Sequence, residues 1–464
     1  MNGILEQLQS LAKALEAGSY NAAPGSLVQG SALQIEDLSP VMHNVTFGED
    51  ALKLQKMVKV ESCKSTLAQF DRQLSYGIFG GSAQLEGAVG QEETSDFVRA
   101  TVSMCFYSHI RRVTIAANLV ATVDGQKAED RAAADAAKKL AGDIEFDLFR
   151  GKADFTNSGV FDGNLMAIPG QVPNMLGLDV QVRSSDMLSN TQDLMFAEYG
   201  SNLSVVIAGG GTLTQNMIED ASVRSAMNHG SADKLVVDPL VLSAYNKIAF
   251  GKERIVLAGS PQDATAADLR RQWVSGGTVN IEASRFLSGK TGPNRARLSS
   301  PTVPVIAVLT DSNAASTALS GTYVYYYTNC NELGESSPSP SLSAVLAAGD
   351  RANLQLTATT GTRYFNVYRS PAGGTTATAR FIGRIANSGA ATTQFLDLGN
   401  KLPGFVTGFL LQGDVMGVKE LAPYSRLKLA VSDLSQPEAH FRFLTLAVYE
   451  PRKLVLVDNL VGSL

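Results

Sequence analysis

Residues 127–150 read KAEDRAAADAAKKLAGDIEFDLFR, and this stretch is the strongest helix signal in the chain. Apolar side chains recur along it at helical spacing, so one face can be buried: Ala133, Ala137, Leu140, Ile144 and Leu148. Asp135 and Lys139 stand four positions apart in the favourable order, which predicts an ion pair along the helix. At 1.5 Å per residue the helix would be about 36 Å long. We therefore expect one long helix, a spine that organises the domain around it.

The chain on the carboxyl side of this helix alternates between helix and strand signals. Helices are predicted over 186–198 and 213–228, and strands over 203–208, 234–237, 255–257 and 278–281. Asp238-Pro239 is a strong helix start, because aspartate caps a first turn and proline fits its first position. Residues 185–300 are therefore expected to form a mixed domain of helices and strands.

At Pro301 the composition changes. Residues 301–404 hold 11 charged residues and 6 of the 13 tyrosines, and they show short β-rich runs with turn residues between them. Tyr323, Tyr325 and Tyr327 alternate with their neighbours, which places one side of that strand in a sandwich core. About 100 residues of this pattern is the size of an immunoglobulin-like sandwich. Residues 301–404 are therefore interpreted as an inserted β-module. The chain returns afterwards, and Phe441–Tyr449 and Leu454–Val457 read as two strands of one main-domain sheet flanking Pro451.

The amino-terminal part looks too poor in apolar residues to form a core. Residues 1–18 read as a short amphipathic helix, and the stretch to about Ser39 is rich in small and polar residues. From 65 to 108 interrupted strand signals and many glycines predict a long hairpin or extended loop, which needs a neighbour to rest on. Residues 111–123 are predicted to be a strand, which Asp124-Gly125 turns towards the long helix.

Composition and charge exclude several classes of function. The chain of 464 residues is 44% apolar and 18% charged, so most of its length is expected to fold into two or three domains. Its net charge of -5 offers no basic field for nucleic acid. Cys63, Cys105 and Cys330 lie far apart without a Cys-x-x-Cys pair, which indicates free thiols in a reducing compartment. No stretch approaches the ~18 consecutive apolar residues of a membrane-spanning helix.

The candidate chemical motifs all have simpler structural readings. The run Ala208-Gly209-Gly210-Gly211-Thr212 lacks the spacing of a nucleotide loop, and a tight turn is the favoured interpretation. The histidines are scattered without partners at ligand spacing and are read as surface or interface residues: His43, His109, His229 and His440. The same holds for the short basic stretches, which are read as solvated faces or subunit salt bridges: Arg111-Arg112, Arg270-Arg271 and Lys290–Arg297.

Asp143, Glu145 and Asp147 form the one acidic cluster on the predicted spine helix. Residues at i, i+2 and i+4 do not share one helix face, so a paired carboxylate site is not expected. We predict no catalytic, cofactor-binding or metal-binding residues and no cofactor, and the chain is not expected to be an enzyme.

The order of these parts resembles the major capsid protein of a tailed bacteriophage with the Hong Kong 97-like fold. The resemblance is carried by Arg111-Arg-Val-Thr-Ile115 leading into the helix 128–151, by 234–245 (KLVVDPLVLSAY), and by the ending 447–457 (AVYEPRKLVLV). It covers about 360 residues, everything outside the insertion. The insertion resembles a fibronectin III or immunoglobulin-like domain through 321–339, 365–370 and 395–399.

The resemblance implies an α+β fold with the family's parts in order. They are an N-terminal arm (1–64), an extended loop reaching over a neighbour (65–112), a peripheral domain with the spine helix (113–184), an axial domain (185–300), the all-β insertion (301–404), and a return to the axial and peripheral domains (405–464). It also implies pentamers and hexamers in an icosahedral shell around the phage genome, made in the host cytoplasm and located in the virion. The implied partners are portal, a decoration protein, and packaged double-stranded DNA contacted without sequence specificity, with no membrane.

The sequence departs from the family pattern in two ways, and three other functions are alternatives to a major capsid protein. No lysine lies between Lys64 and Lys127, so the family's loop-borne lysine-asparagine crosslink is chemically unavailable, and a non-covalent shell is expected. The sequence starts with only a short helix before the arm, which favours a separate scaffolding protein over a fused one. The alternatives are a tail or portal-associated virion protein, an encapsulin-type shell protein, and an enzyme with an accessory β-module. The module is expected to project outward as decoration, and adhesion to host surfaces is the second reading.

Overall fold

The computed structural model describes residues 48–77, 83–84, 86–87, 90, 92–119, 127–151, 175–182, 204–249, 271–287, 297–310, 319–331, 334–348, 350–397, 399, 401–431 and 433–461. The predicted helices 1–18 and 186–198, the strand 255–257 and most of the arm lie outside these residues, as do His43 and Arg270. Helices and sheets are both present, so the expected α+β class is confirmed.

The spine helix is α4 (Ala128–Arg150), and it begins one residue after the predicted start. Leu140, Ile144 and Leu148 of the predicted stripe are fully buried, which confirms the face that the periodicity indicated. The expected Asp135–Lys139 pair is replaced by two others. Asp135 binds the arginine one turn before it, and Lys139 binds Asp143 one turn after it, at 2.9 Å.

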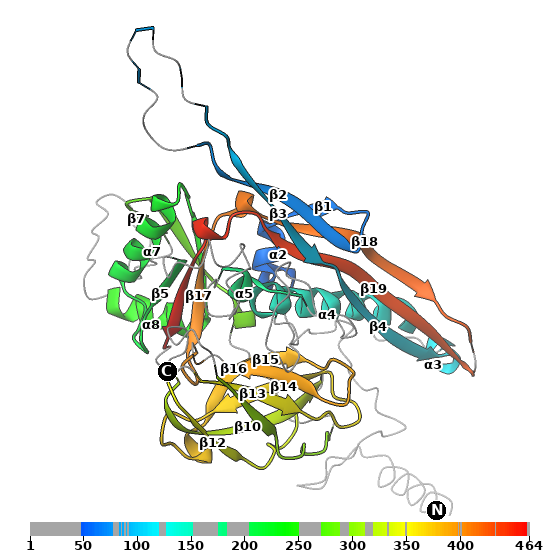
Figure 1. Ribbon diagram of the computed structural model, residues 1–464. Helices are drawn as coiled ribbons and strands as arrows, with labels where there is room; N and C mark the ends of the chain where they lie inside the picture. The colour runs from blue at the N-terminus through cyan, green and yellow to red at the C-terminus, as the bar shows by residue number, and fades with distance from the viewer. Residues whose placement is uncertain are drawn as a thin grey trace, which may run out of the picture.

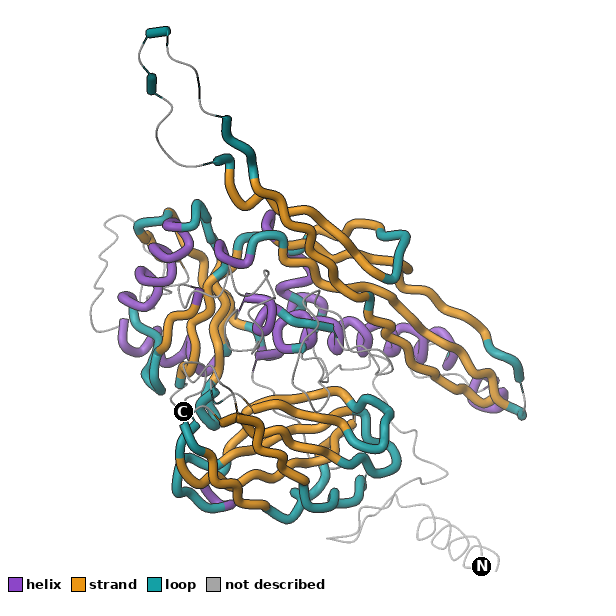
Figure 2. Tube along the Cα trace, viewed as in Figure 1, coloured by secondary structure: helices purple, strands orange, loops and turns teal. Residues whose placement is uncertain are grey.

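A four-stranded sheet lies along this helix in the order β1 (Lys59–Ser62), β18 (Met416–Lys428), β19 (Ser435–Val448), β4 (Cys105–Thr114) (Figures 1 and 2). β1 runs parallel to β18 and the other pairs are antiparallel. The short α2 (Lys53–Met57) and α5 (Leu178–Val182) pack on α4. Within the described residues the sheet and these helices share one apolar core that includes Ile144, Phe149 and Leu446.

Two predictions fail at the start of this sheet. The strand predicted over 111–123 ends at Thr114, and Ile115–Leu119 forms the short helix α3. The loop predicted over 65–112 ends earlier, because β4 is hydrogen-bonded to β19 along its whole length. Only β2 (Leu67–Ser75) and β3 (Asp96–Ser103) form a separate two-stranded ribbon, which rises away from the body in Figure 1.

A six-stranded sheet forms the mixed part of the fold. Its order is β5 (Val205–Ile207), β20 (Val455–Leu460), β17 (Val406–Leu411), β6 (Lys234–Val237), β8 (Gly277–Ala283), β7 (Arg271–Val274). The predicted helices are α7 (Gln215–Met227), which Thr214 caps by accepting from the amide of Met217, and α8 (Pro239–Ala249) after Asp238. The prediction that Phe441–Tyr449 and Leu454–Val457 are two strands of one sheet is wrong. A 3-10 turn at Pro451–Lys453 separates the two strands. β19 belongs to the four-stranded sheet and β20 to the six-stranded one.

Residues 305–397 form two further sheets packed face to face (Figure 1). One contains β16 (Thr393–Asp397), β13 (Asp350–Leu356) and β9 (Val305–Thr310). The other contains β11 (Gly334–Glu335), β10 (Gly321–Asn331), β14 (Tyr364–Arg369) and β15 (Arg380–Ala386), with β12 (Leu342–Leu346) also on β10. Tyr325 and Tyr327 are fully buried between the sheets, as the alternation predicted. We call this unit the β-module.

The structure bears on two absences noted in the sequence. Among the described helices none is long and apolar enough to cross a membrane. The described parts of the chain contain no group of three or more histidine, cysteine or acidic residues that could hold a metal ion.

Candidate functional site

The outer face of the four-stranded sheet, on the side away from α4, exposes apolar side chains. Residues alternate along β4, so Tyr107 and His109 face α4 while Phe106 and Ile110 face outward. The register aligns Ile110 with Ala439 of β19 and Ala439 with Leu427 of β18, so all three share the outer face. Phe106, Ile110 and Leu427 are 50%, 61% and 55% exposed. An apolar strip therefore crosses three strands.

Aromatic side chains extend this strip toward the middle of the sheet. The rings of Phe106 and Phe443 meet edge to face with centroids 5.0 Å apart, and Phe441 stacks on Phe443 at 5.1 Å. The strip ends at the far tip of the sheet, where Leu119 and Leu434 are 82% and 81% exposed. We call the residues Phe106, Ile110, Leu427, Phe441 and Phe443 the outer strip. Contiguous exposed apolar surface of this kind marks an interaction site.

The ribbon β2–β3 is anchored on the body through the part of β2 that holds Phe70 and Arg72. Arg72 is buried there and donates from Nε to the carbonyl of Tyr449 at 2.7 Å and from a terminal nitrogen to that of Val448 at 2.6 Å. Phe70 packs edge to face on the Tyr449 ring at 5.2 Å. Farther out, Tyr76 and Phe97 are 86% and 66% exposed. A two-stranded ribbon is marginal alone, so its outer part needs a surface that this chain does not supply within the described residues.

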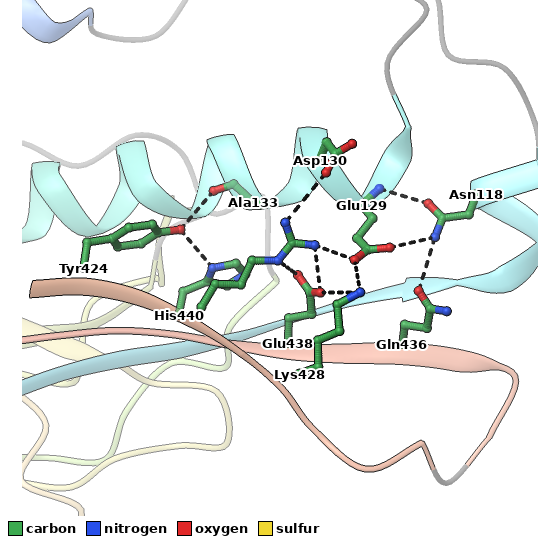
Figure 3. Close-up of polar contacts among 10 residues, drawn as sticks. Asn118, Glu129, Asp130, Ala133, Tyr424, Lys428, Gln436, Glu438 and His440 are labelled. Atoms are coloured by element: carbon green, nitrogen blue, oxygen red, sulfur yellow. Dashed lines mark hydrogen bonds and ion pairs between the residues drawn. The ribbon is translucent and has the colours of Figure 1, made fainter.

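A network of charges pins the amino end of α4 to β18 and β19 (Figure 3). Arg426 forms two hydrogen bonds with Glu438 and also binds Glu129, while Lys428 lies 2.8 Å from Glu129. The hydrogen bond from Lys428 is the main reason that the pKa of Glu129 falls to about 2. The amide of Glu129 is bonded to Asn118 Oδ1 at 3.0 Å. We call these four charged residues the helix latch, because they hold the spine helix in one position on the sheet.

Beside the helix latch, the structure brings together two histidines that lie far apart in the sequence. His109 and His440 are directly paired in the β4–β19 register, with ring centroids 5.6 Å apart. His440 is fully buried, and its Nδ1 lies 3.0 Å from the Tyr424 hydroxyl (Figure 3). Burial lowers the pKa of His440. The period-two pattern places each histidine on one face of its strand, but the partner strand is visible only in the fold.

The remaining candidates have local structural roles. Gly209 and Gly210 adopt positive φ of 60° and 87°, and the amide of Gly211 bonds the carbonyl of Ala208 at 2.9 Å, so the glycine run is a tight turn between β5 and α7. Of the acidic cluster, Glu145 accepts the amide of Leu54 at 2.7 Å, whereas Asp143 and Asp147 lie close enough that the charge of Asp143 helps to raise the pKa of Asp147. Asp147 accepts the Tyr107 hydroxyl at 2.8 Å, and Asp143 binds Lys139.

The basic pair and the cysteines are also placed. Arg112 forms an exposed ion pair with Asp433, while Arg111 faces the α4 side of the sheet. The three cysteines are free thiols, and Cys105 and Cys330 are buried.

No protein-family model and no curated protein matches this chain. Among solved structures, the capsid of a native GTA particle is similar with a TM-score of 0.47 at 11% identity, covering 95% of this chain and 99% of that chain. The capsid of cyanophage A-1(L) gives 0.47 at 11% identity, over 93% and 98%. The encapsulin of Synechococcus elongatus PCC 7942 gives 0.38 at 8% identity, over 91% and 93%.

Proposed function

We propose that this chain is a capsid subunit whose copies assemble through the outer strip and the β2–β3 ribbon. The observation that carries the proposal is the combination of these two surfaces in one chain. One is an apolar strip across a rigid sheet, and the other is a ribbon with exposed aromatic side chains beyond its anchored base.

The two surfaces are suited to each other when they belong to different copies. The ribbon of one copy would lie across the outer strip of the next. Tyr76 and Phe97 of the first copy and Ile110 of the second would then be buried from solvent in the same contact. Full burial of such side chains stabilises by ~1.5–3 kcal/mol each. A head-to-tail contact of this kind closes into rings when its rotation allows.

The finer parts of the proposal follow the Hong Kong 97-like resemblance. Pentamers and hexamers would form an icosahedral shell around a phage genome, located in the virion after assembly in the host cytoplasm. The extended loop is then the β2–β3 ribbon, the peripheral part is α4 with the four-stranded sheet, and the axial part is the six-stranded sheet. Portal, a separate scaffolding protein and a decoration protein are proposed partners. Contact with packaged DNA would be electrostatic and non-specific.

The helix latch supports this assignment in a physical way. A shell subunit has to transmit contacts at its ribbon to contacts at its sheet tip without deforming. Glu129 and Glu438 hold the amino end of α4 on the sheet through Arg426 and Lys428, so helix and sheet move as one body.

The β-module is proposed to be an immunoglobulin-like unit that projects from the shell as decoration. Its size, its two packed sheets and its buried Tyr325 and Tyr327 support this reading. The chain leaves the six-stranded sheet before the module and rejoins it in β17, which pairs with β6 and β20. An insertion of this topology can be added to a shell subunit without breaking its sheet.

Negative-stain electron microscopy of the chain expressed with its neighbouring genes tests the proposal. Closed shells of uniform diameter are the expected result, with surface knobs that disappear when residues 301–404 are deleted. Tubes or rings would instead support a tail component, and a persistent monomer would revive the enzyme reading. Shells formed by this chain alone around a protein cargo would support the encapsulin-type compartment.

A further inference from the structure

A cleft of about 380 Å³ lies where the β-module meets the body. Its walls include Tyr107 and Arg111 of β4, Asp147 of α4, and Tyr364 and Arg384 of the β-module. The volume is in the ~300–1,000 Å³ range of small-molecule sites. Groups from four separate elements, β4, α4, β14 and β15, therefore converge on one space.

Arg384 is held in a fixed orientation at this cleft. Its guanidinium carbon lies 4.2 Å from the centre of the Phe146 ring and 4.0 Å from that of Tyr364, so the planar group is sandwiched between helix and module. Its Nε donates to Asn366 Oδ1 at 3.2 Å. Its two terminal nitrogens have no acceptor among the described residues, and both are accessible to solvent. A guanidinium held this way presents a rigid fork of donors.

The charges around Arg384 leave the cleft positive. Arg111 and Arg363 also line it, and neither has an acceptor or an ion pair within the described parts of the chain. Lys139 and Asp143 neutralise each other at 2.9 Å. Burial raises the pKa of Asp147 to about 7, so this carboxyl is only partly ionised at neutral pH. Three arginines thus face one carboxyl whose ionisation burial opposes, in a chain of net charge -5.

We propose that this cleft binds a small multivalent anion bearing phosphate or carboxylate groups. Both groups match the paired donors of a guanidinium, and such hydrogen bonds are about twice as strong as neutral ones. Arg384 is the central donor, with Arg363 from the same module and Arg111 from β4 of the body. A bound anion therefore bridges module and body. All three donors belong to one chain, so the site does not depend on assembly.

Calorimetric titration of the purified full-length protein with inorganic phosphate and, separately, with citrate tests this site. We expect saturable binding of at least one anion at low ionic strength, with a rise in melting temperature. Phosphate binding alone assigns a phosphate ligand, and citrate binding alone assigns a carboxylate ligand. Arg384→Gln is expected to weaken binding at least about tenfold, a loss of ~1.4 kcal/mol.

Two further variants keep the test decisive. Arg380→Gln on the same strand is the matched control, because Arg380 donates to the carbonyls of Ala377 and Ala379 and lies outside the cleft. Arg363→Gln changes an exposed residue and leaves the Phe146–Arg384–Tyr364 packing intact, so it is expected to fold and to bind several-fold more weakly. Absence of saturable binding by either anion, or wild-type affinity in both Arg384→Gln and Arg363→Gln, would overturn the proposal.

Discussion

Replacing Ile110 by aspartate should block assembly without unfolding the subunit. Ile110 lies on the outer strip, where it is 61% exposed and aligned with Ala439 and Leu427. Because most of the side chain is already in water, an aspartate there costs the isolated subunit little. In an assembled contact the same position would lose its water.

The size of the effect follows from the exposed fraction. Full burial of an isoleucine side chain is worth ~1.5–3 kcal/mol, so the part still exposed corresponds to about 1–2 kcal/mol per contact. That is about a 5- to 30-fold weaker contact, before the cost of removing water from the new carboxylate. Each copy in a ring repeats the loss, so closed shells should disappear at concentrations where the wild type assembles.

Sedimentation through a density gradient measures assembly, and thermal unfolding of the subunit fraction measures stability. Val345→Asp is the matched control, because Val345 is 74% exposed on β12 of the β-module and lies outside the outer strip. We expect the Ile110→Asp subunit to melt within a few degrees of the wild type and to stay unassembled, while Val345→Asp forms shells. Normal shells from Ile110→Asp would refute the assignment of the outer strip as a contact between copies.

Three further outcomes are expected. The pKa of His440 is lowered in the folded chain, so the unfolded chain binds more protons and stability should fall as pH drops below about 6.5. Thermal melts between pH 8 and 5 should show this loss, and the His440→Gln variant should show less of it. An equal dependence of melting temperature on pH in both proteins would contradict the reasoning. Glu145→Ala leaves the amides of Leu54 and Gln55 without their acceptor and should cost about 2–4 kcal/mol in urea unfolding, with a change below ~0.5 kcal/mol counting against the contact. Assembled particles should dissolve into single chains on denaturing gels, because no lysine lies between Lys64 and Lys127, and a ladder of crosslinked chains would disprove this.

The elements that sequence reasoning predicted well are those specified by neighbouring residues. The spine helix, α7 and α8 after Asp238-Pro239 each depend on side chains within one or two turns. The glycine turn at Gly209–Gly211 depends only on backbone freedom at those positions. On α4, Glu145 accepts the amide of Leu54, whereas Asp143 and Asp147 stand one turn apart and line the same cleft, so the spacing argument separated only the middle residue of the three.

Apart from the Asp135–Lys139 pair on α4, the predictions that failed concern strands and their distant partners. Residues 115–119 carry an apolar run that fits either a strand or a helix, and the end of the sheet at Thr114 makes it a helix. β19 and β20 have similar strand patterns, and only the turn at Pro451 and the neighbouring strands decide that they join different sheets.

The sequence by itself determined the local elements, the class of the fold, and the lack of a lysine in the ribbon region. Only the tertiary structure decided which groups meet: His109 with His440, Arg426 with Glu129 across 297 positions, and Arg384 between Phe146 and Tyr364. The reason is physical. A helix satisfies its hydrogen bonds within itself, whereas a strand can bond to any other strand, and its register is chosen by the side chains that the whole fold buries.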